Sequence, residues 1–105
     1  MPRLSRGSHR RNPETLILNQ VRGVLISLGY GVLRVPVPIY TSQKGWSDLL
    51  VIKNGKAYFV EIKTEKGRQR PDQKAFQEQV EAYGCKYFII RSPEEAEQIF
   101  KNLED

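Results

Sequence analysis

The sequence has very few of the residues on which zinc, thiol and histidine chemistry depend. Its 105 residues include one cysteine, Cys85, and one histidine, His9. A lone cysteine cannot form an intramolecular disulfide, and such sparing use is typical of a protein in a reducing compartment. His9 lies in a polar N-terminal stretch, which argues against a histidine-based zinc site and against a histidine general base.

Long apolar runs are also missing. No stretch approaches the 18 or so consecutive apolar residues that a membrane-spanning helix needs, so we expect no contact with a membrane. The N-terminal region is basic but has no apolar segment of the kind that defines a secretory signal. We therefore expect an intracellular protein, of the cytoplasm or nucleoid, that is not secreted.

Negative charge is in the minority. The chain has 17 lysines and arginines against 12 acidic residues, and its net charge of +5 favours a polyanionic partner. Much of the excess lies in residues 1–12, which we expect to form a basic, disordered arm. This arm either contacts a nucleic-acid backbone or only adds solubility. Residues 13–105 are the right length for a single domain.

Apolar periodicity and turn residues predict an α/β fold in that domain. The predicted elements are a helix over 13–29, strands over 30–40, 49–52 and 57–62, a helix over 71–84, a strand over 86–90 and a helix over 93–103. Pro36 and Pro38 confine the first strand to a sheet edge or end it early. The last strand follows a helical crossover, so it should lie parallel to its partner. One mixed sheet results.

Local signals mark the ends of these elements. Asn12 is suited to cap the first helix, and Pro13 to begin it. Asn54-Gly55 is a strong hairpin-turn signal between the second and third strands. Ser92 and Glu95 form a predicted capping box at the last helix, in which each side chain accepts from the backbone of the other.

The hairpin has charged residues where a strand should be apolar. Strand alternation places Glu61 and Lys63 side by side on one face, and Asp48 begins the partner strand. Two close carboxylates favour a cation between them, and oxygen ligands favour Mg²⁺ or Mn²⁺. A nearby lysine can orient a water or stabilise charge on a phosphate. Alternatively, Asp48 is a turn residue and Glu61 with Lys63 is an exposed ion pair on an edge strand.

This pattern resembles a known family. Asp48 followed by a short strand, a turn and Glu61-Ile62-Lys63 is similar to the PD-(D/E)XK nuclease superfamily, although Ser47 stands where a proline often precedes the aspartate. The fuller run resembles the VRR-NUC branch of that superfamily. Its further features are Gly45 before the aspartate, a basic loop, Gln73 opening a helix and Gly84 ending it. The resemblance covers roughly residues 14–90.

The resemblance implies a restriction-endonuclease-like core with a metal site. It points to Glu14 as a third acid, which by itself is an ordinary residue of a helix first turn. Glu14, Asp48 and Glu61, with the Ile62 carbonyl, are then expected to hold one or two Mg²⁺ or Mn²⁺ ions. Lys63 and Gln73 would assist catalysis; without the resemblance, Gln73 is a solvent-facing helix residue.

The expected substrate is DNA, recognised through its backbone and shape. Lys66, Arg68 and Arg70 follow Lys63 directly, and together with Lys44 they are predicted phosphate contacts. The resemblance favours a homodimeric Holliday-junction resolvase acting on branched DNA, because two sites related by a dyad suit a four-way junction. A flap or replication-fork nuclease, and a catalytically silent DNA-binding module, are the alternatives.

Overall fold

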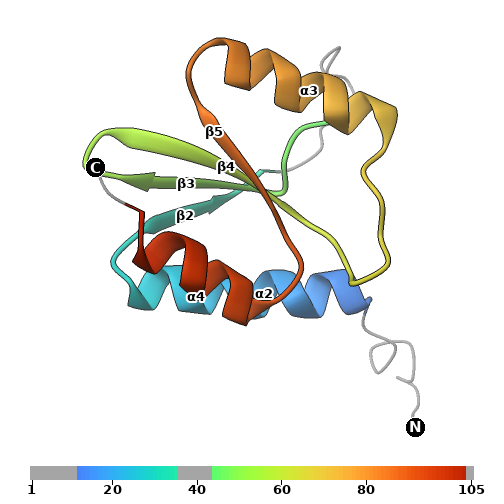
Figure 1. Cartoon of the computed structure of the whole chain (residues 1–105). Coiled ribbons are helices and arrows are strands. Elements are labelled where there is room, and N and C mark those ends of the chain that lie inside the picture. Colours follow the sequence, from blue (N-terminus) through green and yellow to red (C-terminus); the bar gives the residue numbers. More distant parts are fainter. Residues whose placement is uncertain (1–11, 36–43, 104–105) are drawn as a thin grey trace, which may run out of the picture.

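The computed structural model describes residues 12–35 and 44–103, and the elements found there follow the predicted order (Figure 1). They are α2 (Pro13–Ser27), β2 (Gly31–Arg34), β3 (Leu49–Lys53), β4 (Lys56–Ile62), α3 (Pro71–Ala82), β5 (Lys86–Ile90) and α4 (Pro93–Lys101). The predicted arm, apart from Asn12, and the part of the first strand beyond residue 35 lie outside the described residues. Within the described ranges, none of the helices has the length and apolar character needed to cross a bilayer.

The strands form one mixed sheet in the order β2-β3-β4-β5. The pairs β2–β3 and β3–β4 are antiparallel, whereas β4 and β5 are parallel, as the crossover through α3 requires. Helices α2 and α4 lie together on one face of the sheet, and α3 lies on the other (Figure 1). The predicted α/β fold with a mixed sheet is confirmed, and β4 is an interior strand.

The helix ends follow the local signals, with one correction. The Asn12 side chain accepts a hydrogen bond from the Glu14 amide at 2.8 Å, and Pro13 is the first residue of α2. At α4 the Ser92 hydroxyl accepts from the Glu95 amide at 3.1 Å, as predicted. The Glu95 carboxylate, however, accepts from the backbone amide of Arg91 at 2.7 Å and not from that of Ser92. The box therefore reaches one residue further back, into the end of β5.

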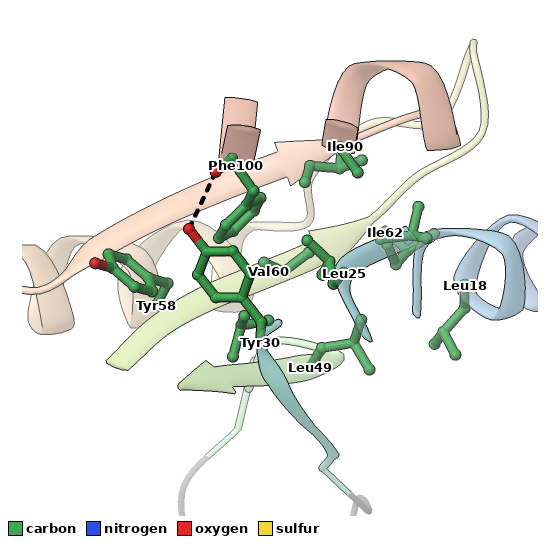
Figure 2. Close-up of a cluster of buried hydrophobic side chains, with 12 residues drawn as sticks. Leu18, Leu25, Tyr30, Leu49, Tyr58, Val60, Ile62, Ile90 and Phe100 are labelled. Carbon is green, nitrogen blue, oxygen red and sulfur yellow. Dashed lines mark hydrogen bonds between the residues drawn. The ribbon is translucent and has the colours of Figure 1, made fainter. Parts of the chain in front are cut away.

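The main core lies between the sheet and the helix pair α2 and α4 (Figure 2). Tyr58, Val60 and Ile62 alternate along β4 and are buried there, as strand periodicity predicts. At one end of this core the Tyr30 hydroxyl donates to the Phe100 carbonyl at 3.0 Å, which satisfies a buried polar group (Figure 2). The other core residues include Leu18, Val21, Leu25, Leu49, Val51, Ile90 and Ala96.

A smaller aromatic cluster joins α3 to the opposite face of the sheet. Phe76 of α3 is buried, and its ring centroid lies 4.7 Å from that of Trp46, 5.7 Å from that of Phe59 and 6.4 Å from that of Tyr87. These contacts bury apolar area on the face that also holds Glu61. They therefore set the distance of α3 from that carboxylate.

The segment before β3 packs directly on the beginning of α3. Gly45 has a φ of +81°, a conformation that glycine adopts without strain. A Cβ atom at this position would lie only 2.5 Å from the Asp72 carbonyl carbon and 2.9 Å from the Gln73 amide nitrogen. Two backbones thus meet where only glycine fits, and this contact orients the short segment that leads to Asp48.

Candidate active site

Glu61 and Lys63 are buried, although both carry ionisable side chains. Glu61, on the interior strand β4, is 0% exposed, and Lys63, directly after that strand, is 6% exposed. Their Oε2 and Nζ atoms lie 3.3 Å apart. These positions contradict the alternative of an exposed ion pair on an edge strand. A buried ion pair is costly to desolvate and is weak evidence of stabilisation, which favours a functional role for it.

The two oxygens of the Glu61 carboxylate have different surroundings. Oε1 accepts a hydrogen bond from the Tyr87 hydroxyl at 2.6 Å and another from the Gln69 amide at 3.0 Å. Oε2 is buried and has no hydrogen bond with any of the residues that the structure describes. Its contact with Lys63 is close enough for Coulombic attraction but lacks the alignment of a hydrogen bond. A buried carboxylate oxygen left in this state has capacity for another cationic partner.

Asp48 lies across the hairpin from this pair and is tied to it by the backbone. Its Oδ2 accepts from the Ile62 amide at 2.7 Å. Burial raises the pKa of Asp48, and the charges of Glu14 and Glu61 raise it further. The Ile62 hydrogen bond and the Lys63 charge act in the opposite direction but do not cancel this effect. The negative charges of both other predicted acids thus act on the pKa of Asp48, as expected for a site that attracts a cation.

Glu14 meets Asp48 at a small cavity. The cavity has a volume of about 70 Å³, room for a few water molecules, and Glu14, Asp48 and Ile62 all line it. Thr15, Leu18 and Arg34 complete the lining. The first turn of α2 therefore reaches the same end of the sheet as the Asp48 hairpin, as the family resemblance implied. The catalytic and metal-binding roles of these residues stay predictions.

Arg34 is a residue of this cavity that the sequence did not reveal. It is the last residue of β2 and lies in register with Leu49, next to Asp48. Its side chain is exposed, and within residues 12–35 and 44–103 no ion pair is found between it and Glu14 or Asp48. Only the strand register brings this cation to the acids, so a linear pattern could not indicate it.

The donor set fits a hard divalent ion in its chemistry. All candidate ligands are oxygens, and the buried Oε2 of Glu61 has no hydrogen bond. In the part of the chain that the structure describes, no three acidic, histidine or cysteine residues already form a closed metal-binding group. Asp48 and Glu14 share one cavity, while Glu61 faces Lys63. Burial is the main cause of the raised pKa of Asp48, and the charges of Glu14 and Glu61 add to it.

The two glutamines near the site have different roles in the structure. Gln73 is buried, and its side-chain oxygen accepts from the Arg70 amide at 2.9 Å, so it caps α3. Gln69, which the sequence did not single out, contacts Glu61 and also donates to the Gln77 side chain at 2.9 Å. The predicted catalytic assistance by Gln73 stays a prediction.

The predicted phosphate contacts do not have equal freedom to bind DNA. Lys66 and Arg68 are exposed, and neither has an ion pair with another described residue. Arg70 is also exposed, but its guanidinium lies 3.1 Å from the Asp72 carboxylate and lowers the pKa of that carboxyl through a hydrogen bond. Lys44 is exposed beside Gly45, at the beginning of α3. Lys66 and Arg68 are therefore the best placed of the four.

Arg91, at the end of β5, fixes the conformation of the basic loop that runs from Thr64 to Arg70. Its guanidinium donates to the carbonyls of Thr64 and Gly67, at 2.7 Å each. The Gly67 amide also donates to the Thr64 carbonyl at 3.1 Å, which closes a turn. The loop is thus held by its backbone, and the side chains of Lys66 and Arg68 project from a fixed support.

Comparison with known proteins agrees with this architecture. No family model matches the sequence, and no curated protein matches it. A solved structure described as a VRR_NUC domain is similar with a TM-score of 0.76, at 23% sequence identity. The match covers 89% of this chain and 99% of that chain. The chain therefore has the fold of a VRR_NUC domain, and the resemblance first seen in its motifs is confirmed at the level of fold.

Proposed function

We propose that this chain, which has the fold of a VRR_NUC domain, is a divalent-metal-dependent endonuclease that hydrolyses DNA phosphodiesters. The observation that carries the proposal is the buried pair of Glu61 and Lys63 beside Asp48. The Oε2 atom of Glu61, which has no hydrogen bond with a described residue, and the raised pKa of Asp48 support a site suited to a cation. The printed name of the similar structure, VRR_NUC, agrees with nuclease chemistry.

Four groups would hold the ion: the carboxylates of Glu14, Asp48 and Glu61, and the Ile62 carbonyl. When bound, Mg²⁺ or Mn²⁺ supplies Lewis-acid activation of water and neutralises charge on the phosphate. The Ile62 amide holds one oxygen of Asp48 at 2.7 Å, which leaves the other oxygen for the ion. Glu14, in the first turn of α2, would complete the set from the lining of the same cavity.

Lys63 is the residue of this chain best suited to act on the reacting atoms. In the hydrolysis, a water oxygen forms a bond to phosphorus and loses a proton, the bond to the leaving oxygen breaks, and that oxygen gains a proton. The buried Lys63 ammonium has three N–H donors and one close acidic partner. It would orient the attacking water, or stabilise the negative charge that develops on the phosphate.

The surrounding cations support binding through the DNA backbone. Lys66 and Arg68 project from the loop that Arg91 fixes, and Arg34 lines the acid cavity. Contacts of these cations with phosphates carry no direct sequence information, so recognition of shape and phosphates is favoured over base readout.

We further propose that the domain acts as a homodimer on four-way DNA junctions. Symmetric resolution needs two incisions, whereas one core supplies one active site. Leu33 and Ile52 are 54% and 36% exposed. They lie on the sheet face opposite the main core, because the neighbouring Val32 and Val51 face that core. Such exposed apolar side chains on adjacent strands support self-association.

The test is a panel of labelled linear, flap, fork and four-way DNAs with Mg²⁺, Mn²⁺ or EDTA, together with light scattering. The proposal expects a dimer that cuts the four-way junction symmetrically and leaves linear duplex mostly intact. Glu61→Gln should abolish cleavage but retain DNA binding, whereas Glu94→Gln, an exposed acid of α4, should cut normally. If the protein is a monomer that cuts only flaps, the proposed resolvase function is wrong and a flap-nuclease function takes its place. Inactivity on every DNA with either metal would leave a DNA-binding module.

A further inference from the structure

The unequal surroundings of the Glu61 oxygens indicate a role for two residues outside the predicted site. On the premise that the domain binds a divalent ion as proposed above, we propose that Tyr87 and Gln69 are positioning residues for Glu61. They occupy Oε1 by hydrogen bonds and so leave Oε2 as the one oxygen available to the ion. Without them the carboxylate could rotate or present both oxygens.

Tyr87 reaches Glu61 along the sheet. It lies on β5 in register with Phe59, two residues before Glu61 on β4, and on the same face. Its ring packs edge-on against Phe76, which restricts its rotation. Burial raises the pKa of Tyr87 far above its ordinary value, and the Glu61 carboxylate raises it further.

Gln69 reaches Glu61 from the basic loop. Its amide nitrogen donates both to Glu61 at 3.0 Å and to the Gln77 side chain at 2.9 Å. Gln77 in turn donates to Glu81 at 3.1 Å, one turn further along α3. The amide is therefore fixed at both of its donors, and its orientation toward Oε1 depends on the docking of α3.

The carboxylate as a whole is then only partly satisfied. A carboxylate can accept about four hydrogen bonds, and both of those made by Glu61 fall on one oxygen. If Tyr87 served only to satisfy a buried polar group, removal of its hydroxyl would cost stability and nothing else. A positioning role predicts in addition a loss of metal affinity, because partners that orient a ligand typically change affinity by about 10–100-fold.

The chain offers a matched control for this distinction. Tyr30 is also a buried tyrosine, and its hydroxyl donates to the Phe100 carbonyl at 3.0 Å. It lies in the main core, on the other side of the sheet from Glu61. Tyr30→Phe and Tyr87→Phe each remove one buried hydroxyl, but only Tyr87→Phe removes it from Glu61.

The experiment is calorimetric titration of Mn²⁺ into the DNA-free protein and its variants, with urea unfolding of each. Tyr87→Phe is expected to weaken Mn²⁺ binding by about 10–100-fold. Tyr30→Phe is expected to leave Mn²⁺ affinity unchanged, although the two variants should lose similar amounts of stability. Gln69→Met should also weaken Mn²⁺ binding. Gln79 is an exposed glutamine of α3, so Gln79→Met serves as the control and should not weaken binding. Should Tyr87→Phe fail to fold, the Gln69→Met comparison decides.

Two negative outcomes are distinguishable. Wild-type Mn²⁺ affinity in both Tyr87→Phe and Gln69→Met, with wild-type protein that binds the ion, overturns the positioning role and leaves the proposed nuclease intact. Absence of Mn²⁺ binding to the wild-type protein overturns the proposed metal dependence, and the positioning role with it.

Discussion

Replacement of Gly45 by alanine should separate α3 from the segment that leads to Asp48. The new methyl group would lie 2.5 Å from the Asp72 carbonyl carbon and 2.9 Å from the Gln73 amide nitrogen, and closer still to the Asp72 carbonyl oxygen. These are backbone atoms at the beginning of a helix, so no side chain can rotate away. Either α3 or the segment before β3 must move.

Two costs add at this position. An alanine at a φ of +81° is strained by about 1–2 kcal/mol. The overlap with the α3 backbone adds an overpacking cost of about 1–3 kcal/mol. The sum is a large part of the ~5–15 kcal/mol stability of an ordinary domain. In a domain of this size, each kcal/mol lowers Tm by about 4–8 °C.

Gly55 provides the control, because it shares the backbone conformation without the contact. Its φ is +79°, and a Cβ there would meet no atom within 4 Å. Urea unfolding of Gly45→Ala and Gly55→Ala should give a difference of about 1–3 kcal/mol, which isolates the steric term. Gly45→Ala should also weaken Mn²⁺ binding, since it displaces Asp48. Equal destabilisation by the two substitutions would refute this account of the contact.

Three further predictions concern charge. Because the pKa of Asp48 is raised in the folded protein, this residue contributes to the free energy of unfolding in a pH-dependent way. The contribution is fully present below the unfolded pKa of 3.8 and is lost as the pH rises through the folded pKa. In EDTA at pH 7, urea unfolding should therefore show that Asp48→Asn is at least as stable as the wild type. At pH 3 any gain in the free energy of unfolding of Asp48→Asn over the wild type should be absent. Arg34→Ala should slow DNA cleavage at least about tenfold, the worth of one charged hydrogen bond, whereas Arg22→Ala, an exposed residue of α2, should not; equal rates would remove Arg34 from the site. Neutralising Lys66 or Arg68 should each lower the salt slope of DNA binding by about one, measured by anisotropy, and a sequence-selective loss would indicate base contacts instead.

Much of the fold could be predicted from the sequence, because the signals concerned are local. The alternation that buries Tyr58, Val60 and Ile62 repeats every two residues along one strand. Asn54 and Gly55 both adopt positive φ at the predicted turn, as their backbone preferences allow. The parallel pairing of β4 and β5 follows from the single helix between them. The same local order of residues carried the family resemblance, and with it the expectation that Glu14 and Asp48 share a site.

The partners of those residues were decided only by tertiary structure. Tyr87 and Gln69 converge on one oxygen of Glu61 from a neighbouring strand and a loop, and Arg34 reaches the acids through the register of β2. Each contact depends on strand register or on how closely α3 docks, which no short window of sequence specifies. A hydrogen bond is made or lost within about 1 Å. The chemistry of the site could therefore be predicted from its residue types. The orientation of its carboxylates, in contrast, was determined by packing between segments far apart in the chain.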